Sequence, residues 1–276
     1  MAAVSMAAVK ELRERLGAGM LDSKNALIEA EGDIEKAIEI LRLKGLKGVA
    51  KRGDREASEG LVAVKQTDGA ATMIELVCET DFVAKNEKFI ALADRVLEAI
   101  AAAGAADVEA ASAAPLEGKT VGEIVTDEAA IIGERIVLRK VTRVEAPSTS
   151  VYLHRTSKDL PPQIGVVVGY EGDDADAALS IARHISFADP LYVTREEVPA
   201  ADVEKEREIV TEISKNEGKP EAALPKIVEG RLNAFFKQVV LNEQAHALDD
   251  EKRDVKKVAD AAGITVTGFA RSKVGA

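Results

Sequence analysis

The sequence is poor in cysteine, and this limits both its redox chemistry and its capacity for metal binding. Its 276 residues include a single cysteine, Cys78, and no tryptophan. One cysteine excludes an internal disulfide and a multi-thiolate metal site, and it fits a reducing cytosol. Because Cys78 follows an apolar run, we expect its thiol to be buried and inert.

Long apolar runs and an excess of basic residues are also missing. No run of about 18 apolar residues occurs, so the sequence predicts no membrane-spanning helix. The formal net charge of −11 argues against an extended nucleic-acid surface, because such a surface needs an excess of Lys and Arg. Residues 1–8 lack a basic segment and a long apolar segment, so we expect no secretory signal there.

The sequence contains no catalytic or metal-binding motif that withstands inspection. Gly118-Lys119-Thr120 resembles the end of a phosphate-binding loop, but Ala113 stands where the first glycine belongs. The histidines lie far apart and show no metal-ligand spacing; they are His154, His184 and His246. We therefore expect no enzyme activity, no metal and no cofactor. A site built from scattered carboxylates is the weakest alternative.

Hydrophobic periodicity predicts an α+β fold that begins with a small helical domain. Residues 1–45 contain three short helical patterns separated by glycine turns, with Asp22 and Asp33 as caps of the second and third helices. The third helix is expected to stop near Gly45. Residues 46–59 are rich in charge and glycine, and we interpret them as a linker. Its basic run is either solvated or a contact for ribosomal RNA or an acidic partner.

Two core subdomains of similar plan are expected to follow. Residues 60–144 predict two strands around Asp68-Gly69, then two helices and a strand. Residues 145–276 repeat the order strand, strand and helix, and Thr194 has the spacing of a capping box. Within them, residues 201–240 predict an antiparallel helical hairpin around Gly218-Lys219-Pro220. From the sequence alone, this hairpin either projects into water or lies on the core.

The most informative stretch joins a strand that ends near Cys78 to an amphipathic helix. Asn86 is a plausible cap of that helix, whose apolar stripe consists of Phe89, Leu92, Ala93, Val96, Leu97 and Ile100. We interpret residues 80–85 as a short loop with Asp81 and Phe82 near its tip. An exposed Phe forgoes about 1.5–3 kcal/mol of burial. From its position alone, Phe82 is therefore expected to fold back under its own helix, and display to a partner is the alternative.

The heptapeptide Thr80-Asp81-Phe82-Val83-Ala84-Lys85-Asn86 resembles the signature of the elongation factor Ts family. These proteins are nucleotide exchange factors for the translational GTPase elongation factor Tu. Further matches occur in family order at residues 9–20, 32–39, 164–168, 218–220 and 228–231. The resemblance covers nearly the whole chain. It reverses the expectation for Phe82, which then becomes a wedge displayed for a partner.

The resemblance implies a ubiquitin-associated-like fold for the first domain and a projecting coiled coil for the hairpin. It also implies that Asp81 and Phe82 enter the partner's nucleotide domain and disturb its magnesium-side contacts. Thr80 and Val83 would hold the shape of the loop.

Secondary partner contacts are implied at Leu12, Met20 and Leu21 of the N-terminal domain, and at His154 of the second subdomain. The glycines before Met20 are equally well explained as helix punctuation. His154 is equally well explained as a satisfied histidine at a strand end, and residues 156–162 make its spacing depart from the family pattern.

The implied function is that of a cytoplasmic translation elongation factor that acts without a cofactor. It would bind elongation factor Tu with GDP and promote exchange of GDP for GTP by displacing magnesium and loosening the phosphate site. No membrane or direct nucleic-acid partner is expected, and a heterotetramer with two copies of each protein stays open. The rival reading is a passive adaptor or chaperone that binds proteins through its helical domain and hairpin.

Overall fold

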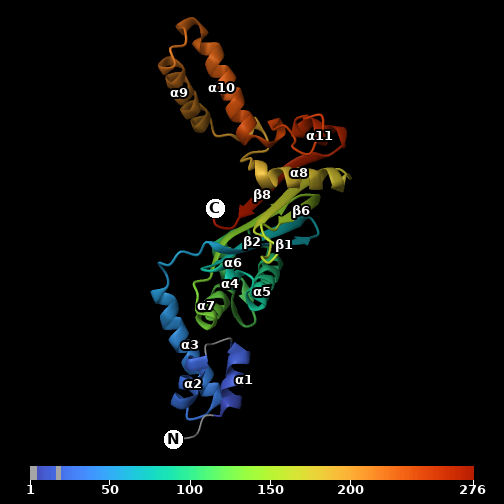
Figure 1. Ribbon diagram of the computed structural model, residues 1–276. Coiled ribbons are helices and arrows are strands. Elements are labelled where there is room, and N and C mark those ends of the chain that lie inside the picture. Colours follow the sequence, from blue (N-terminus) through green and yellow to red (C-terminus); the bar gives the residue numbers. More distant parts are fainter. Residues whose placement is uncertain (1–4, 17–19) are drawn as a thin grey trace.

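The computed structural model describes residues 5–16 and 20–276. The chain is elongated, with the N-terminal helices at one end, two β-sheets in the middle and a helical hairpin at the other end (Figure 1). The mixture of helices and antiparallel sheets confirms the predicted α+β class. Among the described residues, no helix is long and apolar enough to cross a membrane.

The N-terminal part consists of α1 (Met6–Leu16), α2 (Met20–Glu29) and α3 (Ile34–Lys51). Asp33 caps α3 as predicted, since its carboxylate accepts the backbone N–H of Lys36 at 3.1 Å. The cap expected at Asp22 is wrong, because α2 already begins at Met20. The stop expected near Gly45 is also wrong, since α3 continues through residues 46–51, the first part of the predicted linker. Gly45 has a packing role instead, described below.

The first sheet has the antiparallel order β1-β2-β5 and carries the largest core. Its strands are β1 (Glu59–Thr67), β2 (Ala70–Cys78) and β5 (Val137–Glu145). The predicted tight turn at Asp68-Gly69 is confirmed, with Gly69 at φ +72° and Thr67 paired with Ala70. The connection from β2 to β5 contains α4 (Asp81–Ala84), α5 (Glu87–Ala103), α6 (Val108–Ala113), the small hairpin β3 (Pro115–Leu116) and β4 (Lys119–Thr120), and α7 (Val121–Ile132).

The second sheet has the order β6-β7-β8 and is also antiparallel. It contains β6 (Ser148–His154), β7 (Ile164–Glu171) and β8 (Thr265–Lys273), with α8 (Ala175–Ala188) and α11 (Val255–Ala261) packed beside it. The short 3-10 helices η1 (Arg195–Glu197) and η3 (Leu241–Glu243) flank the hairpin. The two sheets share an apolar cluster that includes Val62, Met73 and Val167.

The capping box expected at Thr194 is wrong. Thr194 precedes η1 but makes no side-chain cap hydrogen bond. The Glu197 carboxylate instead accepts the backbone N–H of Val193 at 2.9 Å. The spacing of these residues therefore predicted a capping box that the start of η1 does not form.

The helical hairpin consists of α9 (Ala200–Asn216), η2 (Glu221–Ala223) and α10 (Leu224–Val239). It projects away from the second sheet, which decides between the two placements left open by the sequence (Figure 1). Val210, Val228 and Leu232 form a small apolar cluster within the hairpin itself. At its base, the Arg195 guanidinium pairs with Glu243 and lies 4.3 Å from the centre of the Phe236 ring.

Candidate functional site

Residues 81–84 form the one-turn helix α4, so the short loop expected over residues 80–85 is wrong at these positions. Thr80 is its N-cap, with extended backbone (φ −126°, ψ 154°) and a hydroxyl that accepts the N–H of Val83 at 3.4 Å. Asn86 then caps α5 as predicted, because its side chain accepts the N–H of Lys88 at 2.9 Å. The turn is therefore held between the end of β2 and the start of α5.

Phe82 is displayed outside this turn. Its side chain is 74% exposed, the largest fraction among the exposed large hydrophobic side chains of the described residues. The alternative in which Phe82 folds back under its own helix is therefore wrong. Beneath it, Ala84 is buried and Val83 packs partly against the core of the first sheet. The ring thus stands on a turn whose opposite side is anchored.

Two charged groups flank the ring. The Lys85 ammonium lies 4.7 Å from the centre of the Phe82 ring and donates to the Asp81 carboxylate at 2.9 Å. The hydrogen bond from Lys85 lowers the pKa of Asp81 below its ordinary value. Asp81 is consequently an anion at neutral pH, and it stands next to an exposed aromatic ring.

Glu134, just beyond the end of α7, also holds the turn. Its carboxylate accepts the Thr80 backbone N–H at 3.0 Å and the Thr80 hydroxyl at 2.6 Å. A reciprocal bond runs from the N–H of Arg135 to the Glu79 carboxylate at 2.7 Å. Such charge-assisted bonds are about twice as strong as neutral ones. Sequence analysis missed Glu134, because no local pattern signals a partner so far along the chain.

Cys78 supports the same turn and is buried, as expected. Its thiol is fully buried and donates to the Thr80 carbonyl at 3.3 Å. Burial, with a smaller contribution from the charge of Glu134, raises the pKa of Cys78 to about 12. A buried thiol with a raised pKa is expected to contribute packing and to react slowly.

The other predicted residues lie in different parts of the chain. Met20 and Leu21 are 53% and 69% exposed at the start of α2; the glycines before them lie outside the described residues. Leu12 is a correction: its side chain is fully buried in the core of the N-terminal helices, so it supports that fold from inside. His154 is exposed at the end of β6, with Nδ1 3.0 Å from the Tyr152 hydroxyl.

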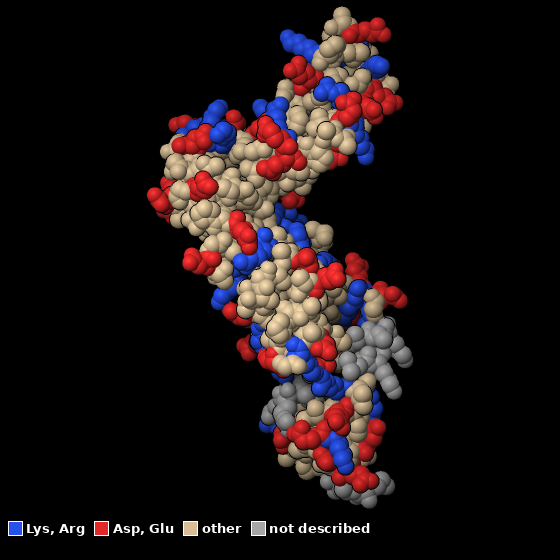
Figure 2. Space-filling view, turned by 180° about the vertical axis from the view of Figure 1, so that it is seen from behind, with Lys and Arg blue, Asp and Glu red and all other residues tan. Residues whose placement is uncertain are grey.

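The face of the molecule seen in Figure 2 carries mixed charge. Figure 2 shows Lys and Arg interspersed with Asp and Glu over the visible face, and no single basic patch dominates it. In residues 5–16 and 20–276, no group of three or more His, Cys, Asp or Glu side chains is arranged to hold a metal ion. The displayed ring and its braced turn are the most distinctive chemical feature.

Comparison with known proteins places this architecture in a family. The family model described as elongation factor TS matches residues 79–276. The elongation factor Ts of Clavibacter michiganensis subsp. michiganensis is 68% identical over 276 residues, which is the full length of both chains. The chain belongs to the elongation factor Ts family.

Other full-length relatives agree with this assignment. The elongation factor Ts of Leifsonia xyli subsp. xyli is 64% identical over 277 residues, and that of Micrococcus luteus is 56% identical over 278 residues. Each alignment covers the whole of both chains, so the N-terminal helices outside the family-model match also have counterparts. The resemblance seen in the sequence is confirmed, and the chain is a translation elongation factor.

Proposed function

We propose that this chain binds elongation factor Tu in its GDP-bound state and promotes release of GDP and its replacement by GTP. The observation that supports this most is the Phe82 ring, 74% exposed on a turn that Glu134, Asn86 and the buried Ala84 hold in place. The exposed ring forgoes the free energy of its own burial, and the turn that carries it is held in place. Both properties suit insertion of the ring into another protein.

The target of such a wedge is sensitive to small displacements. A GTPase holds its nucleotide through backbone N–H groups around the phosphates and through a magnesium ion that bridges two of them. Magnesium requires nearly ideal octahedral oxygen geometry. Phe82 would displace one element of that pocket, and the Asp81 carboxylate would disturb the magnesium side. Thr80 and Val83 would keep the wedge in shape.

The mechanism requires no covalent step by this chain, so we propose that it is an exchange factor and not an enzyme. Binding of the factor and binding of GDP would oppose each other equally, because a coupling free energy acts in both directions. The complex would form in the cytoplasm. Met20 and Leu21 would contact the same nucleotide domain, and His154 would contact another domain of the partner.

The proposal keeps the order of domains expected from the sequence and moves the first boundary to the end of α3. We propose that the N-terminal domain extends to residue 51, and that residues 60–144 and 145–276 form the two core subdomains. A heterotetramer with two copies of each protein is one assembly that this arrangement permits.

Release of a fluorescent GDP from purified elongation factor Tu tests the function. The parent chain is expected to accelerate release, and Phe82→Ala is expected to slow the stimulated rate by roughly tenfold or more, as for a truncated hot-spot ring. Phe187→Ala is a matched control, because that ring is 60% exposed at the end of α8, far along the chain from the turn. Its stimulated rate should equal that of the parent.

Two outcomes would count against the proposal. Equal stimulated rates for Phe82→Ala and the parent would refute the wedge. Binding of the parent to elongation factor Tu with no acceleration of release would favour the passive adaptor.

A further inference from the structure

Helix α7 is shared by the N-terminal helices and the Phe82 turn. α3 packs against α7, and Gly45 of α3 lies against Ala130 of α7. A Cβ added to Gly45 would lie 2.5 Å from the Ala130 carbonyl oxygen and 2.7 Å from the Ala130 Cβ. Real Cβ atoms do not approach backbone so closely. Glycine is therefore required here by helix contact, although it lies in the interior of α3.

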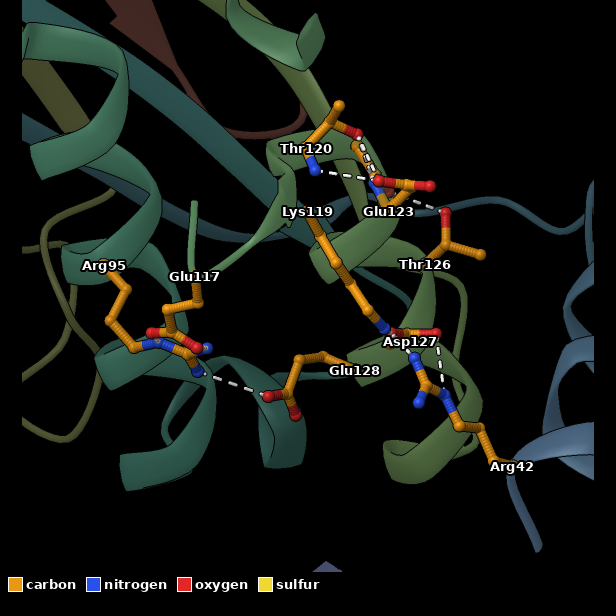
Figure 3. A network of polar contacts seen from close by, with 10 residues as sticks. Arg42, Arg95, Glu117, Lys119, Thr120, Glu123, Thr126, Asp127 and Glu128 are labelled. Atoms are coloured by element: carbon orange, nitrogen blue, oxygen red, sulfur yellow. Dashed lines mark hydrogen bonds and ion pairs between the residues drawn. The ribbon is translucent and has the colours of Figure 1, made fainter. Parts of the chain in front are cut away.

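Polar groups hold the same contact on either side of the glycine. Arg42 of α3 donates through Nε to the Asp127 carboxylate of α7 at 3.2 Å, and a second Arg42 nitrogen also contacts that carboxylate. Lys119 pairs with Asp127 as well, so two cations converge on one anion (Figure 3). Arg52, just beyond α3, donates to the Ala129 carbonyl of α7 at 3.3 Å.

Among the side chains that the structure describes, the contact does not extend a common apolar core. The buried core of the N-terminal helices and the core under the first sheet are separate clusters. A cavity of about 610 Å³ lies between them, lined by Ile38 and Leu41 on one side and by Ile124 and Ile131 on the other. The placement of α3 on α7 therefore depends on the glycine crossing and on the polar pairs.

The C-terminal end of α7 leads directly to the brace of the Phe82 turn. The Ala129 carbonyl that Arg52 reaches also accepts the N–H of Gly133, the left-handed residue that ends the helix. The next residue is Glu134, which holds Thr80 by two hydrogen bonds. One rigid helix thus fixes both the N-terminal helices and the wedge.

We propose that Arg42, Gly45 and Arg52, packed against Asp127, Ala129 and Ala130, form a positioning seam. This seam holds the exposed Met20 and Leu21 at a fixed distance from Phe82, so that two apolar surfaces meet one partner as a rigid unit. The identity of that partner rests on the proposed function. The seam residues need not touch the partner. They would reduce the conformational entropy that is lost on binding, because the N-terminal helices and the Phe82 turn are already fixed relative to each other.

The free protein provides the first test, independent of any partner. Lys24→Cys on α2 and Asp94→Cys on α5 place two exposed spin-label sites, and the native Cys78 stays unlabelled because it is buried. Pulsed electron resonance is expected to give a narrow distance distribution for this labelled parent. Adding Gly45→Ala should broaden it.

Gly230→Ala is the matched control for this measurement. Gly230 is also inside a helix, but an added Cβ there would meet nothing within 4 Å. Alanine favours the helix at both sites, so broadening confined to Gly45→Ala cannot come from loss of helix. Arg42→Gln should broaden the distribution as well, and Arg42→Lys should restore part of the order. An unchanged narrow distribution for Gly45→Ala would overturn the seam.

The exchange assay tests the positioning role. Gly45→Ala is expected to raise the factor concentration for half-maximal stimulation by roughly five- to tenfold, as two surfaces lose their fixed alignment, and to leave the maximal rate largely unchanged. Phe82→Ala is expected to lower the maximal rate instead. A broadened distance with an unchanged half-maximal concentration would overturn positioning while the proposed function stands. No effect of Phe82→Ala would overturn the proposed function, and the distance measurement would still report on the seam.

Discussion

Replacing Glu134 by glutamine tests whether the brace of the Phe82 turn matters for function. The Glu134 carboxylate accepts two hydrogen bonds from Thr80, one from the backbone N–H and one from the hydroxyl. Glutamine has almost the same shape but offers one oxygen and one NH₂ group. One of the two donors of Thr80 then faces another donor. The Thr80 hydroxyl accepts the N–H of Val83 with one lone pair and could accept the glutamine NH₂ with the other, but its own proton would then lose the carboxylate as its acceptor.

The expected size of the effect follows from this loss. A hydrogen bond to a charged group contributes about 1.5–3 kcal/mol, and partial solvent exposure of Glu134 reduces this to about 1 kcal/mol. A free energy of about 1 kcal/mol corresponds to roughly a fivefold change in the population of the ordered turn. Hydrogen exchange at the amides of Val83 and Ala84 should accelerate by a similar factor. Stimulated release of fluorescent GDP from elongation factor Tu should slow by up to the same factor.

A matched control separates the brace from a general effect of lost charge. Glu98→Gln removes the same charge from an exposed position on α5, where Glu98 pairs only with Lys65 at 2.7 Å among its described contacts. It should leave both measurements unchanged. If Glu134→Gln leaves amide exchange and GDP release at parental values, the reasoning that Glu134 orders the wedge is wrong.

Two further predictions concern buried groups that take no part in the proposed mechanism. Because Cys78 is buried and its pKa is raised to about 12, its thiol should react very slowly with Ellman's reagent at pH 8 in the native chain. The denatured chain should release one equivalent of the coloured thiolate. Fast reaction of the native chain would contradict the burial. Burial lowers the pKa values of His184 and His246 below their ordinary value of about 6.5, so the unfolded chain binds more protons than the folded chain as pH falls through this range. Thermal stability should therefore decline from pH 7 towards pH 5, and His184→Gln should reduce that slope; an equal slope for parent and variant would contradict it.

Local patterns in the sequence predicted many elements correctly. The apolar stripe from Phe89 to Ile100 is buried in α5, because a 3.6-residue period over three turns has few other solutions. Asp68-Gly69 forms the turn between β1 and β2, since a two-residue hairpin needs positive φ. The heptapeptide signature identified the stretch that carries the displayed ring.

The features that the sequence did not reveal depend on contacts between distant residues. Glu134 accepts a hydrogen bond from Thr80, and Asp127 accepts one from Arg42. These partners are far apart in the sequence, so no periodic pattern of residues predicts the contacts. A glycine such as Gly45 is typical of a helix end, but here it lies inside α3 and allows α3 and α7 to pack closely. α4 is too short to show a period, so its capping by Thr80 became visible only with the backbone in place.

The helical hairpin has an apolar cluster of its own. At its tip, a Cβ added to Gly218 would meet no atom within 4 Å. Val210, Val228 and Leu232 stabilise the hairpin internally, and the ion pair between Arg195 and Glu243 holds its base. The stability of the two sheets therefore does not depend on the tip. Shortening or lengthening this arm by whole helical turns should consequently leave both sheets folded. A reporter peptide grafted between Gly218 and Pro220 would stand well clear of Phe82.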